Sequence, residues 1–137
     1  VDDFAHHPTA VRATVQAAAE RWPSRRVVAV FEPRSNSSRR KVFEEGYATA
    51  FDQAGAVFLS RPPFRHNDRQ EDFMDVDVVI DRIRARRIAA HAAEGADELL
   101  PLILDEIRPG DVALIMSNGG FGGIHDRLLR ALDARQG

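Results

Sequence analysis

Two stretches of the chain are apolar throughout, and these constrain the fold most. They are residues 27–31 (VVAVF) and 112–116 (VALIM). A strand with one solvated face alternates apolar and polar residues, whereas a strand of a parallel sheet is covered on both faces and stays apolar. Residues 56–59 repeat the pattern, and residues 87–91 are a weaker fourth candidate. These stretches predict a parallel sheet buried between two layers of helices.

Helical patterns lie between the predicted strands. In each of them apolar residues recur every three or four positions, and a capping residue, proline or glycine marks an end. Strand and helix alternate about five times, which predicts an α/β fold with an open, mostly parallel sheet and helices on both faces. The apolar helical positions are Val11, Val15 and Ala18; Val42, Phe43, Tyr47, Ala50 and Phe51; Val78, Val79 and Ile83; Leu99, Leu100, Ile103, Leu104 and Ile107; and Ile124, Leu128, Leu129 and Leu132.

Length and charge exclude several classes of protein. A chain of 137 residues has room for one compact domain and not for two. The net charge of -2 gives no general attraction to nucleic acid or to an acidic membrane surface. No stretch approaches the roughly 20 consecutive apolar residues that a membrane span needs. We therefore expect a cytoplasmic domain with neither a nucleic-acid nor a membrane partner.

The residue types present also limit the chemistry. The chain has no cysteine, so any catalysis has to use oxygen or imidazole groups. Lys41 is the only lysine, and it follows Arg40 rather than a glycine-rich loop. This excludes a phosphate-binding loop of the GxxxxGK[ST] type. The chain also begins at Val1 in residues typical of the end of a strand, so we expect a piece of a longer protein.

Three polar segments each follow a predicted strand, and together they form the candidate functional site. They are residues 2–8 (DDFAHHP), 32–40 (EPRSNSSRR) and 117–123 (SNGGFGG). Parallel strands end at the same edge of a sheet, where ligands of such folds gather. The longest irregular segment, residues 60–75, is predicted to be a surface loop over that edge.

The first two segments each allow a binding role and a structural role. In the first, aspartate and histidine side chains could hold a divalent metal ion, or a ribose and its phosphates, and Asp3 could instead cap the following helix. In the second, Arg34 stands among small hydroxyl and amide groups, a set suited to gripping a carboxylate or phosphate. The alternative for it is a solvated loop, with Ser37 or Ser38 capping the next helix.

The third segment places four of the chain's nine glycines within five residues, after a strand and before a helix. Glycines there let backbone N–H groups approach an anion at the helix N-terminus. The spacing does not match G-x-G-x-x-G, and no acidic ribose partner follows about 20 residues later. We therefore expect a backbone platform for a carboxylate or amide substrate rather than a dinucleotide site.

The remaining candidates have ordinary structural explanations. His66 and His125 are expected in a loop and on a helix surface, and His91 at the end of a strand, so no metal site is predicted. Trp22 and Tyr47 are expected in the core or at its rim, because aromatic residues are few and do not lie among basic ones.

Taken together, the three segments resemble the C-terminal domain of the Mur ligases, the ATP-dependent amide ligases of bacterial cell-wall synthesis. Residues 2–10 (DDFAHHPTA) are similar to the motif that opens this domain across much of the family. Residues 31–40 (FEPRSNSSRR) and 116–125 (MSNGGFGGIH) are similar to one branch of it, the murein peptide ligases. That branch joins L-alanyl-γ-D-glutamyl-meso-diaminopimelate, the murein tripeptide, to UDP-N-acetylmuramate in peptidoglycan recycling.

The resemblance implies a three-domain enzyme, of which residues 1–137 are the third, Rossmann-like domain. The N-terminal domain for the UDP-sugar and the central ATPase domain would be its partners, and the central domain would supply most catalytic groups. ATP and Mg²⁺ would belong to the full-length enzyme, with neither bound tightly by this part and no metal site here. The isolated domain is expected to be inactive.

The resemblance also implies roles for individual residues. Asp3 and His6 match motif residues that lie at ATP. The substrate would be bound by Arg34, Ser35, Asn36, Ser117, Asn118, Gly119 and Gly120. The alanine-adding ligases of the family carry a His-Arg-Tyr type string where this chain has Arg34 to Asn36, which makes alanine the less favoured substrate. A single-amino-acid-adding ligase, or a stand-alone module that binds an anion or small ligand, is the alternative.

Overall fold

The described part of the chain forms one four-stranded parallel sheet in a computed structural model. It comprises residues 8–32, 44–60, 76–117 and 127–131. The strand order is β3-β2-β1-β4, so the first strand lies inside the sheet and the chain winds outward from it in both directions. This confirms the predicted parallel α/β fold. The strands are β1 (Val27–Glu32), β2 (Ala56–Ser60), β3 (Ala89–Ala93) and β4 (Val112–Ser117).

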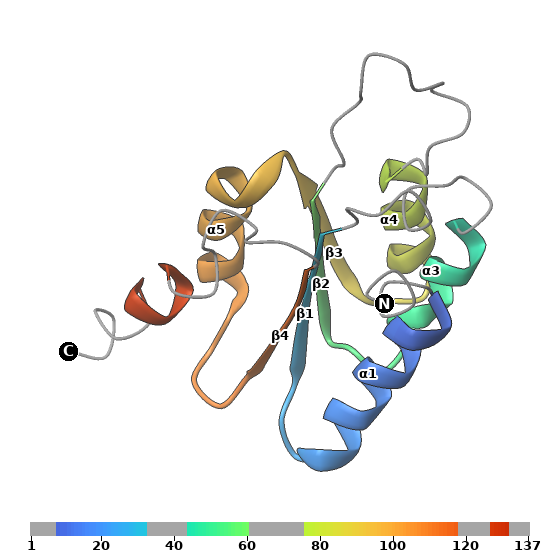
Figure 1. The fold of residues 1–137 in the computed structure, drawn as a ribbon, viewed down its shortest axis with the longest axis horizontal. Coiled ribbons are helices and arrows are strands. Elements are labelled where there is room, and N and C mark those ends of the chain that lie inside the picture. Colours follow the sequence, from blue (N-terminus) through green and yellow to red (C-terminus); the bar gives the residue numbers. More distant parts are fainter. Residues whose placement is uncertain (1–7, 33–43, 61–75, 118–126, 132–137) are drawn as a thin grey trace.

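Helices cover both faces of this sheet, as Figure 1 shows. One face carries three helices and the other carries α5 and a short helical segment at residues 127–131. The helices on the first face are α1 (Pro8–Arg21), α3 (Glu44–Ala50) and α4 (Val76–Ala85), and α5 spans Gly95–Glu106. None of the helices described is long and apolar enough to cross a membrane.

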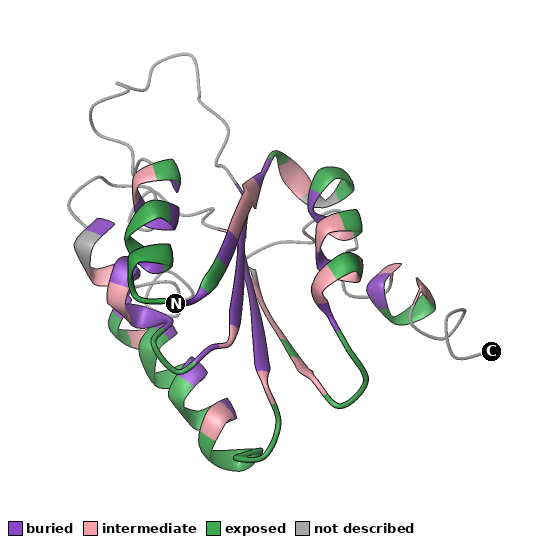
Figure 2. Cartoon of the chain, turned by 180° about the vertical axis from the view of Figure 1, so that it is seen from behind, coloured by how far each residue is buried: buried purple, intermediate pink, exposed green. Residues whose placement is uncertain are grey.

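The strand β1 is apolar throughout because its two faces meet different cores. Val27, Ala29 and Phe31 pack with α1, α3 and α4, while Val28 and Val30 pack with α5. Successive side chains of a strand point to opposite faces, so each core takes every second residue. Figure 2 shows the resulting buried centre, with exposed residues on the outer faces of the helices.

Several predicted element boundaries shift, among them the start of β3 and the end of α5. The strand expected at residues 87–91 begins at Ala89, because Arg87 has φ 67° and belongs to the turn after α4. His91 is therefore in the middle of β3 and not at its end, half-buried with its ring 5.3 Å from that of Phe58. The helix α5 stops at Glu106, since Ile107 is already extended. Ser37, Ser38, Val42, Phe43, Ile124, Leu132, His66 and His125 lie outside the described residues.

An ionic cluster around Arg26 joins three elements at the amino edge of the sheet, where the strands begin. Nη1 of Arg26 donates to Oε2 of Glu106 at 2.7 Å, and Nη2 donates to the Glu106 carbonyl at 2.8 Å. Nη2 also donates to Oδ2 of Asp111 at 2.7 Å. The end of α5 and the start of β4 are thereby tied to the start of β1. Part-buried, charge-assisted hydrogen bonds of this kind are the strong ones.

We expect Arg26→Ala to lower the free energy of unfolding by about 2 kcal/mol, because it leaves two part-buried carboxylates without their cation. Urea denaturation followed by circular dichroism measures this loss. The matched control is Arg86→Ala, which breaks a solvent-exposed pair with Asp52 and should cost much less. Equal losses of unfolding free energy in the two variants would contradict the proposed contribution of the Arg26 cluster to stability.

The Arg26 cluster also predicts that the free energy of unfolding depends on pH. Burial opposes ionisation of Asp111, but hydrogen bonds from Arg26 and from the Arg108 backbone outweigh it and lower the pKa of this carboxyl below 3.8. A lowered folded-state pKa adds stability that is complete above the unfolded value and is lost as pH falls through the folded value. The difference in free energy of unfolding between the native chain and Asp111→Asn should therefore be constant from pH 8 to 5 and become smaller below about pH 4. A gap that widens on acidification would contradict this.

Candidate functional site at the carboxyl edge of the sheet

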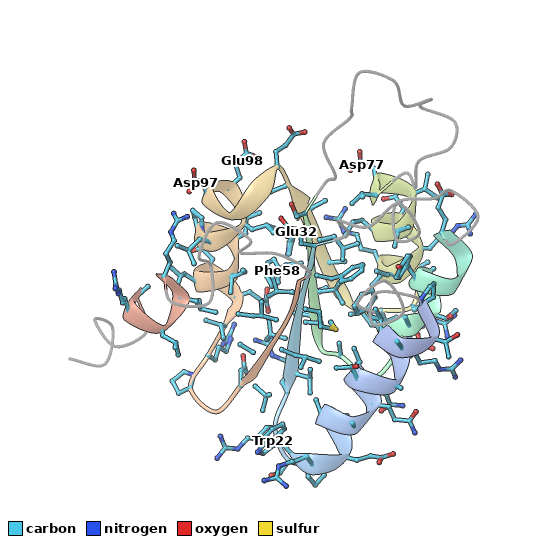
Figure 3. All side chains as sticks on the ribbon, in the orientation of Figure 1. Trp22, Glu32, Phe58, Asp77, Asp97 and Glu98 are labelled. Atoms are coloured by element: carbon cyan, nitrogen blue, oxygen red, sulfur yellow. The ribbon has the colours of Figure 1, made fainter. Side chains whose placement is uncertain are left out.

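The four strands end together, and the loops that carry the predicted site start from their ends. In the strand register Glu32 stands beside Ser117, and Ser60 stands beside Ala93. The helices begin at this same edge, because each runs antiparallel to the strands. In Figure 3 Asp77 lies at this edge on one side of the sheet and Asp97 on the other, with Trp22 at the opposite end of the molecule.

Of the predicted site residues, the structure describes only Ser117, which is the last residue of β4. The others, which are Asp3, His6, Arg34, Ser35, Asn36, Asn118, Gly119 and Gly120, lie outside the described residues. What the structure does place is the residue from which each of the three segments leaves the folded core.

Two of these anchor residues, Glu32 and Ser117, lie beside each other, and the third, Pro8, lies against α3. The second segment leaves β1 after Glu32 and the third leaves β4 at Ser117, and these two residues are partners in neighbouring strands. The first segment enters α1 at Pro8, which is buried against α3. A Cβ added to Gly46 of α3 would lie 2.9 Å from the Pro8 Cβ, so only glycine permits this approach. The fold thus brings the starts of the second and third polar segments together at one edge of the sheet, and packs the residue that follows the first segment against α3.

The start of α3 is held by an aromatic contact beneath this edge. Tyr47 is fully buried, and its ring centroid lies 5.3 Å from that of Phe31 on β1. Burial raises the pKa of Tyr47, so its phenol stays protonated at neutral pH. Trp22 is 38% exposed, with the Arg21 guanidinium over its ring. The core position predicted for Tyr47 is confirmed, whereas Trp22 is exposed beside an arginine.

Ser60, predicted to open the surface loop at residues 60–75, is instead a buried polar residue of this edge, and the rest of that predicted loop lies outside the described residues. It ends β2, is 3% exposed, and its Oγ accepts a hydrogen bond from the N–H of Gly95 at 3.3 Å. Gly95 has φ +82° and opens α5, whose first turn is further held by the Glu98 carboxylate, which accepts from the N–H of Glu94. In the sequence, only the position of Ser60 directly after an apolar strand points to a structural role. Its hydrogen-bond partner, Gly95, is 35 residues away, so the contact cannot be predicted locally.

Ser60→Ala should lower the free energy of unfolding by about 1 kcal/mol, because the Gly95 N–H loses its acceptor at a helix start. Amide hydrogen exchange at Gly95 should also become faster. Thr14→Ala is the matched control, since the Thr14 hydroxyl is exposed on α1 and bonds only to the carbonyl of Ala10 in the preceding turn. Unchanged exchange at Gly95 in Ser60→Ala would contradict this role for Ser60.

The described part of the edge is rich in carboxylates. Asp77, Asp97 and Glu98 lie in the first turns of α4 and α5, and Glu44 is buried at the start of α3. Asp97 pairs with Arg127 at 2.7 Å. No three of the histidine and carboxylate side chains in the described ranges are grouped so that they could hold a metal ion. Arg34, which the sequence predicts to grip a phosphate or carboxylate, lies outside these ranges.

Residues 1–119 match the family model of the Mur ligase, glutamate ligase domain. The chain belongs to the Mur ligase family. This confirms the family expected from the three polar segments, and the parallel sheet with helices on both faces is the Rossmann-like fold expected with it.

Two curated Mur ligases illustrate the similarity. The chain is 39% identical over 132 residues to the UDP-N-acetylmuramate–L-alanyl-γ-D-glutamyl-meso-2,6-diaminoheptandioate ligase of Escherichia coli K12, covering 96% of this chain and 27% of the relative. It is 37% identical over 138 residues to the UDP-N-acetylmuramate–L-alanine ligase of Symbiobacterium thermophilum, covering 98% and 28%. The chain thus spans about a quarter of the length of these relatives.

Solved structures of Mur ligases share this fold. A domain described as part of a UDP-N-acetylmuramate:L-alanyl-γ-D-glutamyl-meso-diaminopimelate ligase of Haemophilus ducreyi has a TM-score of 0.72 at 35% identity, covering 93% of this chain and 85% of that one. The murein peptide ligase of Psychrobacter arcticus has a TM-score of 0.73 at 31% identity, covering 93% and 26%. The UDP-N-acetylmuramate–alanine ligase of Thermotoga maritima, at 17% identity and a TM-score of 0.68, shares the fold.

Proposed function

We propose that this Mur ligase domain is the C-terminal part of an ATP-dependent amide ligase that joins the murein tripeptide to UDP-N-acetylmuramate in peptidoglycan recycling. The observation that carries the proposal is the 39% identity to the Escherichia coli ligase for this tripeptide, over 96% of the chain. The N-terminal UDP-sugar domain and the central ATPase domain are its proposed partners, and the cytoplasm is its proposed location.

In this proposal the carboxyl edge receives the incoming peptide. ATP would transfer its terminal phosphate to the muramyl carboxylate and leave as ADP, and Mg²⁺ would neutralise phosphate charge. The amine of the peptide would then attack the acyl carbon, so that the amide bond forms as the bond to phosphate breaks and a proton is released. Arg34, beside Ser35 and Asn36, grips a peptide carboxylate through a pair of parallel hydrogen bonds. Backbone N–H groups from Ser117 to Gly120 hold a second polar group of the peptide, and Asp3 and His6 lie at ATP.

The anchor positions support this division of roles. Glu32 and Ser117 are paired residues of neighbouring strands, so the segments that begin beside them can act on one substrate. Pro8, which follows the proposed ATP segment, packs against Gly46 of α3. Alignment of amine and acyl group is worth several kcal/mol in a two-substrate reaction.

A ligase that adds L-alanine is the second candidate. The observation that favours it is the 37% identity to the Symbiobacterium thermophilum alanine ligase over 98% of the chain. L-Alanine has one carboxylate, whereas the diaminopimelate residue of the tripeptide offers further carboxylates for Arg34. The Arg34-Ser35-Asn36 string favours the larger substrate.

The full-length protein should ligate the murein tripeptide to UDP-N-acetylmuramate and should use L-alanine poorly, as measured by phosphate release on each amine substrate. Arg34→Ala should raise the KM for the tripeptide at least tenfold, because a charge-assisted pair of hydrogen bonds is lost. The control is Arg12→Ala, which removes an exposed arginine of α1 and should leave KM unchanged.

An unchanged tripeptide KM in Arg34→Ala would overturn the role of Arg34, and a preference for L-alanine would establish the second candidate. Calorimetry on the 137-residue chain separates both from a stand-alone binding module. The ligase proposal expects weak or no ATP binding, because the phosphate grip belongs to the central domain. Tight binding would favour the module.

A further inference from the structure

Glu32, the last residue of β1, lies where the winding of the sheet reverses. From β1 the chain passes to β2 and β3 by α3 and α4 on one face, and it reaches β4, on the other side of β1, by α5 on the opposite face. The neighbouring strands β1 and β4 therefore lead to helices on opposite faces, α3 and the helical segment at residues 127–131. In open α/β sheets ligands bind at the carboxyl ends of the strands where this reversal occurs. Glu32 and Ser117, which are partners in the register, end these two strands.

The side chain of Glu32 belongs to the α5 face of the sheet. Successive side chains of a strand alternate between faces, and Val30 packs with α5 whereas Phe31 packs on the opposite face. Glu32 is half-buried at the end of an otherwise buried strand. Figure 3 shows it in the middle of the carboxyl edge, with Asp97 on one side of the sheet and Asp77 on the other.

The first turn of α5 is held at the same end of this face. The register of β1 with β2 brings Ser60, the last residue of β2, level with Glu32. The Ser60 hydroxyl accepts a hydrogen bond from the N–H of Gly95, which opens α5. Glu32 is thus one strand away from the start of this helix.

The charges on this face favour a cationic ligand next to Glu32. Asp97 and Glu98 lie in the first turn of α5. Asp97 is paired with Arg127, whereas Glu98 accepts from the backbone N–H of Glu94, which leaves its negative charge in place. A half-buried carboxylate near a further carboxylate repels anions and stabilises a cation that approaches it. An ammonium group suits this position, because it has only N–H donors and carboxylate oxygens only accept.

We propose that Glu32 binds the ammonium group of the diaminopimelate residue in the incoming tripeptide, an assignment that rests on the proposed function. The tripeptide carries two amines. The amine of its L-alanine attacks the acyl carbon and has to be uncharged to do so, whereas an ion pair with a carboxylate keeps an amine protonated. The amine of diaminopimelate takes no part in the reaction and can stay charged. Glu32 thereby selects for a peptide that ends in diaminopimelate.

The full-length protein tests this with the murein tripeptide and an analogue that has 2-aminopimelate in place of diaminopimelate. The analogue keeps both carboxylates and lacks the amine. Its KM should be at least tenfold higher than that of the tripeptide, because a charge-assisted hydrogen bond is lost. Glu32→Gln should raise the KM for the tripeptide to near that for the analogue, and Glu32→Ala is a second variant with the same expectation. The matched control is Asp77→Asn, which removes a carboxylate at the same edge on the α4 face and should keep the preference.

Ligation of the tripeptide by the native protein separates the two levels of the proposal. No ligation would overturn the proposed function and the role of Glu32 together. With ligation present, equal KM values for the two peptides in the native protein would overturn the role of Glu32 alone. So would a preference that survives both Glu32 variants. A merely structural role would raise the KM for both peptides by one factor and lower the free energy of unfolding, with the preference retained.

Discussion

The burial of β1 on both faces is the constraint on which the rest of the structure depends. Val27, Ala29 and Phe31 need one apolar layer, and Val28 and Val30 need another. Only helices on both faces satisfy this, and helical crossovers make the strands parallel. Once the strands are parallel, their carboxyl ends share one edge. Glu32 and Ser117, from which the second and third polar segments continue, then stand side by side at that edge.

The sheet could be predicted because its signal is local. Residues 27–31 and 112–116 are unbroken apolar runs, and they became β1 and β4 with boundaries shifted by one residue. The contacts that fasten the sheet could not be predicted in the same way. Arg26 meets Glu106 and Asp111 across 80 and 85 residues, and nothing in the local pattern pairs one arginine with two acids so distant. Ser60 and Gly95 present the same difficulty.

The candidate site stays a prediction, because only Ser117 of its residues is described. The register of Glu32 with Ser117 shows that the second and third polar segments continue from neighbouring strand ends, as the parallel pattern requires. The chemistry of individual side chains comes from the resemblance to the Mur ligases, because a carboxylate grip by Arg34 depends on a loop conformation and not on periodicity. The roles of Arg34 and its neighbours therefore stay predictions.

The central claim is that the murein tripeptide binds at the carboxyl edge of this domain. Backbone amide chemical shifts of the isotope-labelled chain, recorded during titration with the tripeptide to millimolar concentration, test it most directly. The account predicts shifts centred on Glu32, Gly95 and Ser117, with Arg26 and Asp111 at the opposite edge unchanged. Shifts centred on Arg26 and Asp111, or no shift at either edge, would contradict it.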